Sequence, residues 1–346
     1  MTPVPSIAPD STPLKTSLLP SLRASRLGQS IFNQTSANSS ASGRTSKIRG
    51  RIRRAILHSN RLQRLPIRHG IHDFALLMPL AHALPEYRFN FPDYGENLGR
   101  IARTVCCKYP RATIIDIGAN IGDSAAIIRH HAGPVATLCI EPSEEYYPYL
   151  LRNAVAIGPE ITCLKAAVDV SSGVIPARLS AASGTARLLP TTSSESVQVF
   201  SLERIIEMFP QFAEPRLIKV DTDGFDGRIL AGASAFIQKV RPVLFWEFDP
   251  SLDAASSGPG PAIFTMLANA GYAQLTVYTN TGEYLTTVSL QNRNILSDLI
   301  SFFSGRTSSQ YADLCAFSEV DTDLAETLRE HELLNAQQLR GFVQPE

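Results

Sequence analysis

The stretch that decides the fold is Thr113–Asp123, which reads TIIDIGANIGD. Its first five residues form a short, β-branched apolar run that is typical of a buried strand. Gly118 and Gly122 bracket a tight turn, and Asp123 is a favourable residue for starting a helix. A second apolar run, Val135–Glu141, ends on a carboxylate. The pattern predicts a β-α-β unit with a glycine loop at the first crossover and an acid at the tip of the second strand.

This arrangement suits a nucleoside-type cofactor. Glycines let the backbone approach a ligand closely, and the Glu141 carboxylate can accept two hydrogen bonds from a ribose diol. Dinucleotides and S-adenosylmethionine both use such a unit. A dinucleotide needs a G-x-G-x-x-G loop facing its pyrophosphate, whereas Asp116 places a carboxylate there, which suits a cationic amino-acid moiety. The loop therefore favours S-adenosylmethionine over the cofactor of an NAD-dependent oxidoreductase.

Three blocks of the sequence resemble the FkbM-type family of S-adenosylmethionine-dependent methyltransferases. They are DIGANIGD with IEP (116–123 and 140–142), LIKVDTDGFD (217–226) and PVLFWEF (242–248). The resemblance implies an α/β three-layer sandwich, a Rossmann-like class I methyltransferase sheet with a C-terminal antiparallel strand. It implies that the cofactor is held by Asp116, Gly118, Ala119, Asn120, Gly122, Glu141, Pro142 and Asp169. For Asp169, a role as a plain turn residue is weighed equally with cofactor binding.

Acceptor chemistry is expected at the same rim, because ligands of open α/β sheets bind beyond the C-terminal ends of the strands. Asp221, Asp223 or Glu247 is expected to accept the proton of an alcohol acceptor. Lys219 precedes Asp221 by two residues and shares its strand face. It is expected either to tune that carboxylate, to act itself, or to form a structural salt bridge.

No metal site is expected. Asp221, Asp223 and Asp226 offer oxygen ligands, but their spacing is not that of an EF-hand, and the last two can cap the next helix. His130 and His131 are neighbours on a helix and are expected to point to different faces.

Composition narrows the class of protein. The 346 residues carry a formal net charge of zero and are 44% hydrophobic, enough for one large core. No acidic residue lies between Asp10 and Asp73, so the remainder is acidic, which argues against nucleic acid as a partner. Five cysteines without a C-x-x-C pair indicate reduced thiols in a cytoplasmic protein. No apolar run reaches the roughly 18 residues of a membrane span.

Three regions are expected along the chain. Residues 1–45 are rich in Ser, Thr, Pro and Ala and are predicted to be disordered. Residues 46–72 are a basic segment, in which Lys47–Leu65 has apolar residues at helical spacing between arginines. This segment is either an amphipathic helix that touches an anionic membrane or polymer, or an arm packed on the domain. Residues 73–346 are predicted to be the methyltransferase domain, with an N-terminal lead-in and a C-terminal hairpin and helix.

The periodicity also predicts the individual elements. Expected strands are one that starts at 113, and 87–94, 135–141, 161–168, 186–189, 217–221, 243–248, 273–278, 284–288 and 314–317. Expected helices are one that starts at 123 or 124, a short one after Ser201, and 72–84, 98–108, 143–156, 225–237, 262–270, 294–303 and 321–333. Residues 250–261 are expected to be a loop.

The resulting hypothesis is a cytoplasmic S-adenosylmethionine-dependent O-methyltransferase that acts on a hydroxyl of a sugar, a glycan precursor or a natural product. In one interpretation residues 47–65 bring it into peripheral contact with a membrane. The alternatives are an N-methyltransferase on the same scaffold and a non-catalytic cofactor-binding module. The sequence leaves the oligomeric state open.

Overall fold

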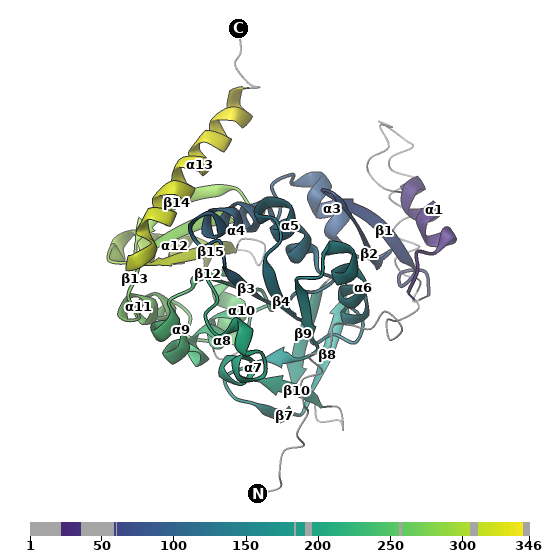
Figure 1. Cartoon of the computed structure of the whole chain (residues 1–346), viewed down its shortest axis with the longest axis horizontal. Coiled ribbons are helices and arrows are strands. Elements are labelled where there is room, and N and C mark those ends of the chain that lie inside the picture. Colours follow the sequence, from purple (N-terminus) through teal and green to yellow (C-terminus); the bar gives the residue numbers. More distant parts are fainter. Residues whose placement is uncertain are drawn as a thin grey trace, which may run out of the picture.

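The computed structural model describes residues 22–35, 59, 61–182, 185–190, 196–255, 258–304 and 311–341. Its centre is an eight-stranded sheet with the order β14-β13-β15-β12-β11-β3-β4-β5. Figure 1 shows this sheet with helices on both sides. The fold is therefore the predicted α/β three-layer sandwich with a Rossmann-like class I methyltransferase sheet.

Five strands of this sheet run parallel and follow the predicted β-α units. They are β3 (Thr113–Ile117), β4 (Ala136–Ile140), β5 (Ile161–Leu164), β11 (Leu217–Val220) and β12 (Val243–Phe248). The chain then adds β13 (Tyr272–Thr279), β14 (Tyr284–Ser289) and β15 (Ala312–Ser318). β15 lies between β12 and β13 and is antiparallel to both, which confirms the predicted C-terminal antiparallel strand.

The two faces of the sheet bury alternate residues of each strand, as the pleat requires. Ile115 and Leu244 lie in a core cluster with one set of helices, whereas Ile114 and Phe245 lie in another. The first set is α7 (Leu202–Met208), α8 (Asp226–Gly232), α9 (Ser234–Val240), α11 (Ala262–Asn269) and α12 (Arg293–Phe303). The second face is covered by α4 (Glu96–Lys108), α5 (Asp123–Ala132), α6 (Tyr147–Ile157) and α13 (Thr322–Gly341).

A second group of short strands lies beyond β5. It comprises β6 (Ala167–Val168), β7 (Gly173–Ile175), β8 (Ala177–Ala182), β9 (Thr185–Pro190) and β10 (Val197–Phe200). β9 contains the weak strand predicted at 186–189. The single strand predicted at 161–168 is wrong, because the chain leaves the large sheet after Leu164 and β6 pairs with β10 instead.

The N-terminal region differs from the expectation in several places. Part of the segment predicted to be disordered forms α1 (Arg26–Thr35), because Ile31 and Phe32 pack against the core cluster around β1. β1 (Pro66–Ile71) pairs along its length with β2 (Phe74–Pro79), so the boundary predicted at residue 73 cuts through a hairpin. Most of Lys47–Leu65 lies outside the described residues.

Two lead-in elements differ in type from the prediction. The predicted helix 72–84 is largely β2, since pairing with β1 and burial of its last four residues override the helical propensity of Leu and Met. The predicted strand 87–94 begins as α3 (Leu84–Asn90), where Pro85 and Glu86 occupy favourable first-turn positions. Its aromatic rings, which suggested a strand, are 41–49% exposed at Tyr87, Phe89 and Phe91.

Two further predictions need smaller corrections. The helix predicted at 225–237 is broken into α8 and α9 after Gly232, a residue that is costly inside a helix. The loop predicted at 250–261 contains the short helix α10 (Pro250–Ala255). None of the described helices combines the length and the hydropathy needed to cross a membrane.

Glu96, the first residue of α4, fastens the β1–β2 hairpin to the sandwich. Its carboxylate is bonded to His72 Nε2 at 2.8 Å, to His131 Nε2 at 2.7 Å and to Arg88 Nη2 at 2.8 Å. Burial alone would raise the pKa of Glu96, but the hydrogen bonds of His131 and Arg88 outweigh it and lower that pKa to about 2. The carboxylate therefore joins the hairpin turn, α3, α4 and α5.

Glu96→Gln is expected to reduce the free energy of unfolding by about 2–3 kcal/mol at pH 7, because an ionised partner of three donors is lost. The pKa of this carboxyl is depressed in the folded state, so its contribution is present above pH 4.5. It should decline by about 1.4 kcal/mol per pH unit as the pH falls from 4.5 towards 2. Urea unfolding of both proteins between pH 7 and pH 3.5 measures this; a pH-independent difference would contradict it.

Candidate functional site

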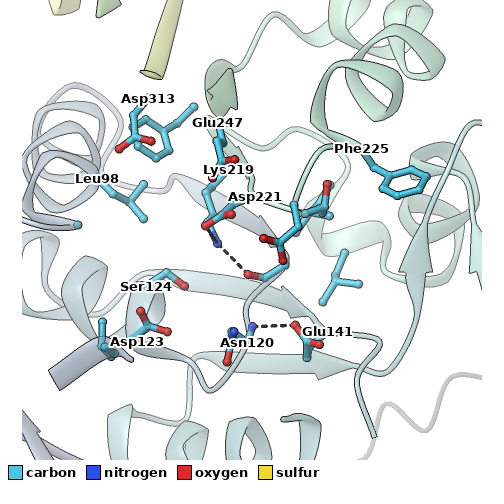
Figure 2. Close-up of a pocket in the computed structure, with 18 of the residues that line it drawn as sticks. Leu98, Asn120, Asp123, Ser124, Glu141, Lys219, Asp221, Phe225, Glu247 and Asp313 are labelled. Atoms are coloured by element: carbon cyan, nitrogen blue, oxygen red, sulfur yellow. Dashed lines mark hydrogen bonds and ion pairs between the residues drawn. The ribbon is translucent and has the colours of Figure 1, made fainter. Parts of the chain in front are cut away.

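The main cavity of the described chain opens at the C-terminal ends of the parallel strands. Its walls include the loop after β3, the ends of β4, β11 and β12, the lead-in turn before α4, and β15. Figure 2 shows Asn120 and Glu141 on one side of Lys219, and Glu247 and Asp313 on the other. The cavity therefore has two halves that share the end of β11.

Lys219 holds the centre of the site together. Its Nζ lies 2.9 Å from the Gly118 carbonyl, 3.0 Å from Asp116 Oδ1 and 3.4 Å from Asp221 Oδ2. Burial would lower the pKa of this amine, but the Asp116 and Asp221 carboxylates raise it well above its usual value. The side chain is 5% exposed and stays an ammonium. It acts as a charged clamp between β11 and the glycine loop.

Asp116 lies behind the cavity wall rather than in it. Its side chain is fully buried and accepts a hydrogen bond from Ser124 Oγ in addition to the ion pair with Lys219. The carboxylate predicted to meet a cationic ligand group is therefore paired within the protein.

Gly118 lies where the ends of two strands come closest. Its φ of +80° is left-handed, and a Cβ at this position would stand 1.8 Å from the Asp221 carbonyl oxygen. The Gly118 N–H donates to Ile140 O at 2.9 Å. Only glycine can adopt this φ and fit into this space. The loop can therefore lie close against the strand ends, and the cavity stays open above it.

Glu141 closes the other end of the same half. Its Oε2 accepts from the Asn120 N–H at 2.9 Å and its Oε1 from the Ser143 N–H at 2.8 Å. Burial raises the pKa of Glu141 to about 7. Nearby, burial lowers the pKa of His82 to about 4, so that His82, 3.3 Å from Asn120 Oδ1, is neutral at pH 7. This half offers a carboxylate and a glycine-lined floor.

The opposite half is built by two carboxyl groups on neighbouring strands. Glu247 of β12 stands directly across from Asp313 of β15. Asp313 Oδ2 accepts from Asn97 Nδ2 at 2.9 Å. Among the described residues the Glu247 carboxyl has no hydrogen bond or ion pair. Burial, followed by the nearby Asp221 charge, raises the pKa of Glu247 well above its usual value, and burial raises the pKa of Asp313 to about 7.

The predicted site residues divide into those that line the cavity and those behind it. Lining residues are Gly118, Asn120, Glu141, Pro142, Lys219, Asp221, Asp223 and Glu247. Asp116, Ala119 and Gly122 support the loop from behind. Asp169 is not in the wall; its oxygens pair with Arg228 at 2.7 and 3.0 Å, because α8 brings the guanidinium against the end of β6.

Several cavity residues were missed by the sequence reasoning. They include Tyr94, Asn97, Asp123, Tyr311 and Asp313. Asp123 starts α5 as predicted, and it also faces the cavity, where burial raises its pKa to about 6. Asp313 precedes a predicted strand, and only the antiparallel insertion of β15 beside β12 brings it to Glu247.

A histidine group lies outside the cavity. His130 and His131 do not diverge as expected: with His72 of the hairpin turn they bring three ligand-capable nitrogens within 4.8 Å of one another. His72 and His130 are stacked at 3.9 Å, and two of the rings bond Glu96. Stacked parallel rings cannot both direct a lone pair at one ion, so the group is a hydrogen-bonded fastening of the hairpin in this geometry.

Comparison with known proteins agrees with the motifs. Residues 116–273 match the model of the methyltransferase FkbM domain. The hexuronic acid methyltransferase AglP of Haloferax volcanii is 28% identical over 131 residues, which are 37% of this chain and 53% of AglP. The chain thus spans about half the length of the curated relative that it matches.

Solved structures with similar folds include an FkbM methyltransferase from Methylobacillus flagellatus, at 16% identity and a TM-score of 0.37, over 60% of this chain and 43% of that one. Another is precorrin-6y C5,15-methyltransferase from Geobacter metallireducens, at 12% identity and a TM-score of 0.33, over 60% and 80%. The fold assignment itself follows from the strand order. Residues 116–273, somewhat less than half of the chain, are similar to the methyltransferase FkbM domain.

Proposed function

We propose that the protein is an S-adenosylmethionine-dependent O-methyltransferase that acts on a hydroxyl of a sugar, a glycan precursor or a related natural product. The observation that carries this proposal is one cavity with two unlike halves. One half has a glycine loop and a buried carboxylate at the tip of the second strand, and the other has carboxyl groups with free hydrogen-bonding capacity.

The first half fits the cofactor. The Glu141 carboxylate is already oriented by two backbone N–H groups, and each of its oxygens retains a lone pair for a ribose hydroxyl. Gly118 and Asn120 would lie under the cofactor, and Pro142 and Val168 would flank its base. Asp221 and Asp123 would face the cationic methionine end, where acids are favourable. When bound, the cofactor supplies an activated methyl group.

The protein's own contribution is mainly placement. Methyl transfer needs the acceptor oxygen in line with the methyl group and shielded from water. The Lys219 clamp fixes the end of β11 against the glycine loop, so that Asp221 and the loop keep a constant spacing. Lys219 has three partners and a raised pKa, which supports a positioning role rather than service as a base. Asp223 follows on the same turn and would contact the acceptor.

A sugar acceptor is supported by the named activity of AglP, a relative that matches over part of its length. The acidic balance of the described cavity supports the earlier expectation that nucleic acid is not a partner. Peripheral contact of residues 47–65 with an anionic membrane or polymer stays a proposal from sequence alone.

Cofactor affinity is expected to depend on the ionisation of Glu141. The diol stabilises the carboxylate, while burial in the free protein raises the pKa of Glu141 to about 7, so the affinity for S-adenosylhomocysteine should fall as the pH drops from 8 to 6. Glu141→Gln should weaken binding about tenfold or more at pH 8 and remove most of that pH dependence, leaving only the part that comes from Asp123.

Isothermal titration calorimetry of both proteins tests this, with NAD as the competing ligand class. The control is Glu145→Gln, which changes a carboxylate in the following turn that does not line the cavity. Unchanged affinity in a folded Glu141→Gln protein would reject the assignment, and binding of NAD without any response to S-adenosylhomocysteine would reject the proposed cofactor.

A further inference from the structure

Glu247 is a carboxyl group in the cavity wall whose hydrogen-bonding capacity is unused by the rest of the described chain. A partly buried carboxyl group without a protein partner is favourably placed to bind a ligand that supplies a hydrogen bond. The neighbouring Asp313 uses Oδ2 for Asn97 and has no partner for Oδ1 among the described residues. The half of the cavity that contains Glu247 and Asp313 therefore offers carboxyl oxygens that can accept hydrogen bonds from a ligand.

We propose that Glu247 and Asp313 together form the acceptor site: they bind one hydroxyl of an uncharged, sugar-like acceptor and take its proton during methyl transfer. This inference rests on the proposed function and extends it to the class of acceptor and to Asp313, which lies outside the matched family domain.

The backbone places the two carboxyls as a pair. They are directly opposite residues of antiparallel strands, and such residues have Cβ atoms about 4.5–5.5 Å apart on one face of the sheet. Both point to the face that α4 covers, where Asn97 is fully buried and holds Asp313. Asn97 is itself fixed, since its Oδ1 accepts from the Leu98 N–H at 2.9 Å. Figure 2 shows both carboxyls at the cavity beyond Lys219.

The charge of the cavity selects against an anionic acceptor. Its described wall contains six carboxyl groups, namely Asp123, Glu141, Asp221, Asp223, Glu247 and Asp313. The Lys219 ammonium is the strong cation among them, and Gly118, Asp116 and Asp221 already engage it. A uronate would bring a further negative charge close to these groups without a free cation, whereas a neutral hydroxyl needs only hydrogen bonds.

Two nearby carboxyls in a partly desolvated site do not both ionise, so the pair holds one proton near neutral pH. The groups that face it are Lys219 and Asp221 at the end of β11, Asp223 of the following turn, Asp226 at the start of α8, and the phenols of Tyr94 and Tyr311. The protonated member can donate to an acceptor oxygen, and the ionised member can accept from the reacting hydroxyl.

The two carboxyls supply the proton acceptor that the transfer step needs. The hydroxyl oxygen forms the new O–C bond, the donor's S–C bond breaks with its electron pair remaining on sulfur, and the hydroxyl proton passes to the ionised carboxylate. The pair then carries two protons and loses one to solvent before the next turnover. A base whose pKa is raised towards neutrality by burial suits this task better than an ordinary carboxylate.

The pair can be examined without acceptor or cofactor. Infrared difference spectra of the free protein between pH 5 and pH 9 should show a carboxylic-acid band that persists at pH 6 and is diminished in both Glu247→Gln and Asp313→Asn. The exposed Glu326→Gln on α13 is the matched control and should leave that band unchanged. Complete ionisation of Glu247 and Asp313 below pH 5 would overturn the shared proton, whatever the cofactor proves to be.

Kinetics test the acceptor role. With p-nitrophenyl glycosides of neutral sugars as probes, Glu247→Gln and Asp313→Asn should each lower kcat by about 100- to 10,000-fold and flatten the rise of rate with pH near 7. The double variant should lose little more, because the two groups act as one unit. Calorimetric affinity for S-adenosylhomocysteine should stay within about twofold, which separates this result from a failure of the cofactor assignment.

The acceptor class is tested with a matched pair of probes, p-nitrophenyl glucoside and p-nitrophenyl glucuronide, which differ by a carboxylate. The rate of methylation should be higher for the neutral compound. In saturation-transfer NMR with the cofactor-loaded but catalytically impaired Glu247→Gln protein, the neutral compound should give the stronger signal of binding. Preference for the glucuronide in either assay would overturn the uncharged-acceptor inference while leaving the methyltransferase proposal intact.

Discussion

Gly118→Ala is expected to weaken cofactor binding strongly and to destabilise the fold. The new Cβ would stand 1.8 Å from the Asp221 carbonyl oxygen, which belongs to the backbone at the end of β11 and cannot rotate away. Left-handed strain and overpacking together should cost about 3–5 kcal/mol. Separating the loop from β11 by about 1 Å should weaken S-adenosylhomocysteine binding roughly 100-fold.

Gly133→Ala is the matched control. Gly133 ends α5 with a similar φ of +77°, but an added Cβ there meets no atom within 4 Å. It should lose about 1–3 kcal/mol, because its φ of +77° and ψ of −162° lie in a backbone region that is essentially restricted to glycine, and it should retain full cofactor affinity. Thermal unfolding and calorimetry on both variants isolate the effect of the clash. Equal losses in the two proteins would show that strain alone, and not the contact with Asp221, matters at Gly118.

The parts of the fold that sequence reasoning found were those with a strong local pattern. The strands β3, β4, β11 and β12 are short apolar runs flanked by turn residues, and their buried positions leave little choice of secondary structure. The hairpin of β13 and β14 was visible in its turn, where Gly282 adopts a φ of +87°. These elements could be placed because local sequence and tertiary environment agree.

The lead-in region could not be predicted for the opposite reason. β2 is a strand only because β1 lies beside it, and α3 presents aromatic rings to the surface in a spacing that also suits a strand. Both elements depend on pairing or packing with residues outside the local stretch, and local periodicity contains no information about those residues. The same holds for Glu96, whose partners His72 and His131 are 24 and 35 residues away.

The candidate site divides along the same line. Gly118 and Glu141 could be recognised in the sequence because each lies at the end of a patterned strand. The close approach of Gly118 to the Asp221 carbonyl oxygen and the hydrogen bond from the Ser143 N–H to Glu141 could not be predicted. Asp313 carries no motif, and its position follows from strand order alone. Conversely, Asp169 ends a predicted strand yet turns to Arg228, since the chain departs from the large sheet before reaching it.

Lys219→Met is expected to lower the free energy of unfolding by about 3–5 kcal/mol, because the buried Asp116 carboxyl would lose its cation. Asp116 is fully buried and Lys219 is 5% exposed, so water cannot replace the lost partner. The exposed Lys239→Met on α9 should change stability by less than about 0.5 kcal/mol and serves as control.

The double variant Lys219→Met with Asp116→Asn separates a clamp from a catalytic lysine. Removing both charges eliminates the unpaired carboxylate, so the double variant should be more stable than Lys219→Met alone, with a coupling of about 1–3 kcal/mol. If Lys219 serves to hold the glycine loop, the recovered stability should bring back part of the cofactor affinity, measured by calorimetry with S-adenosylhomocysteine. A double variant that regains stability and affinity but remains inactive would instead assign Lys219 a direct part in the transfer, since the clamp would then be dispensable and the ammonium would not.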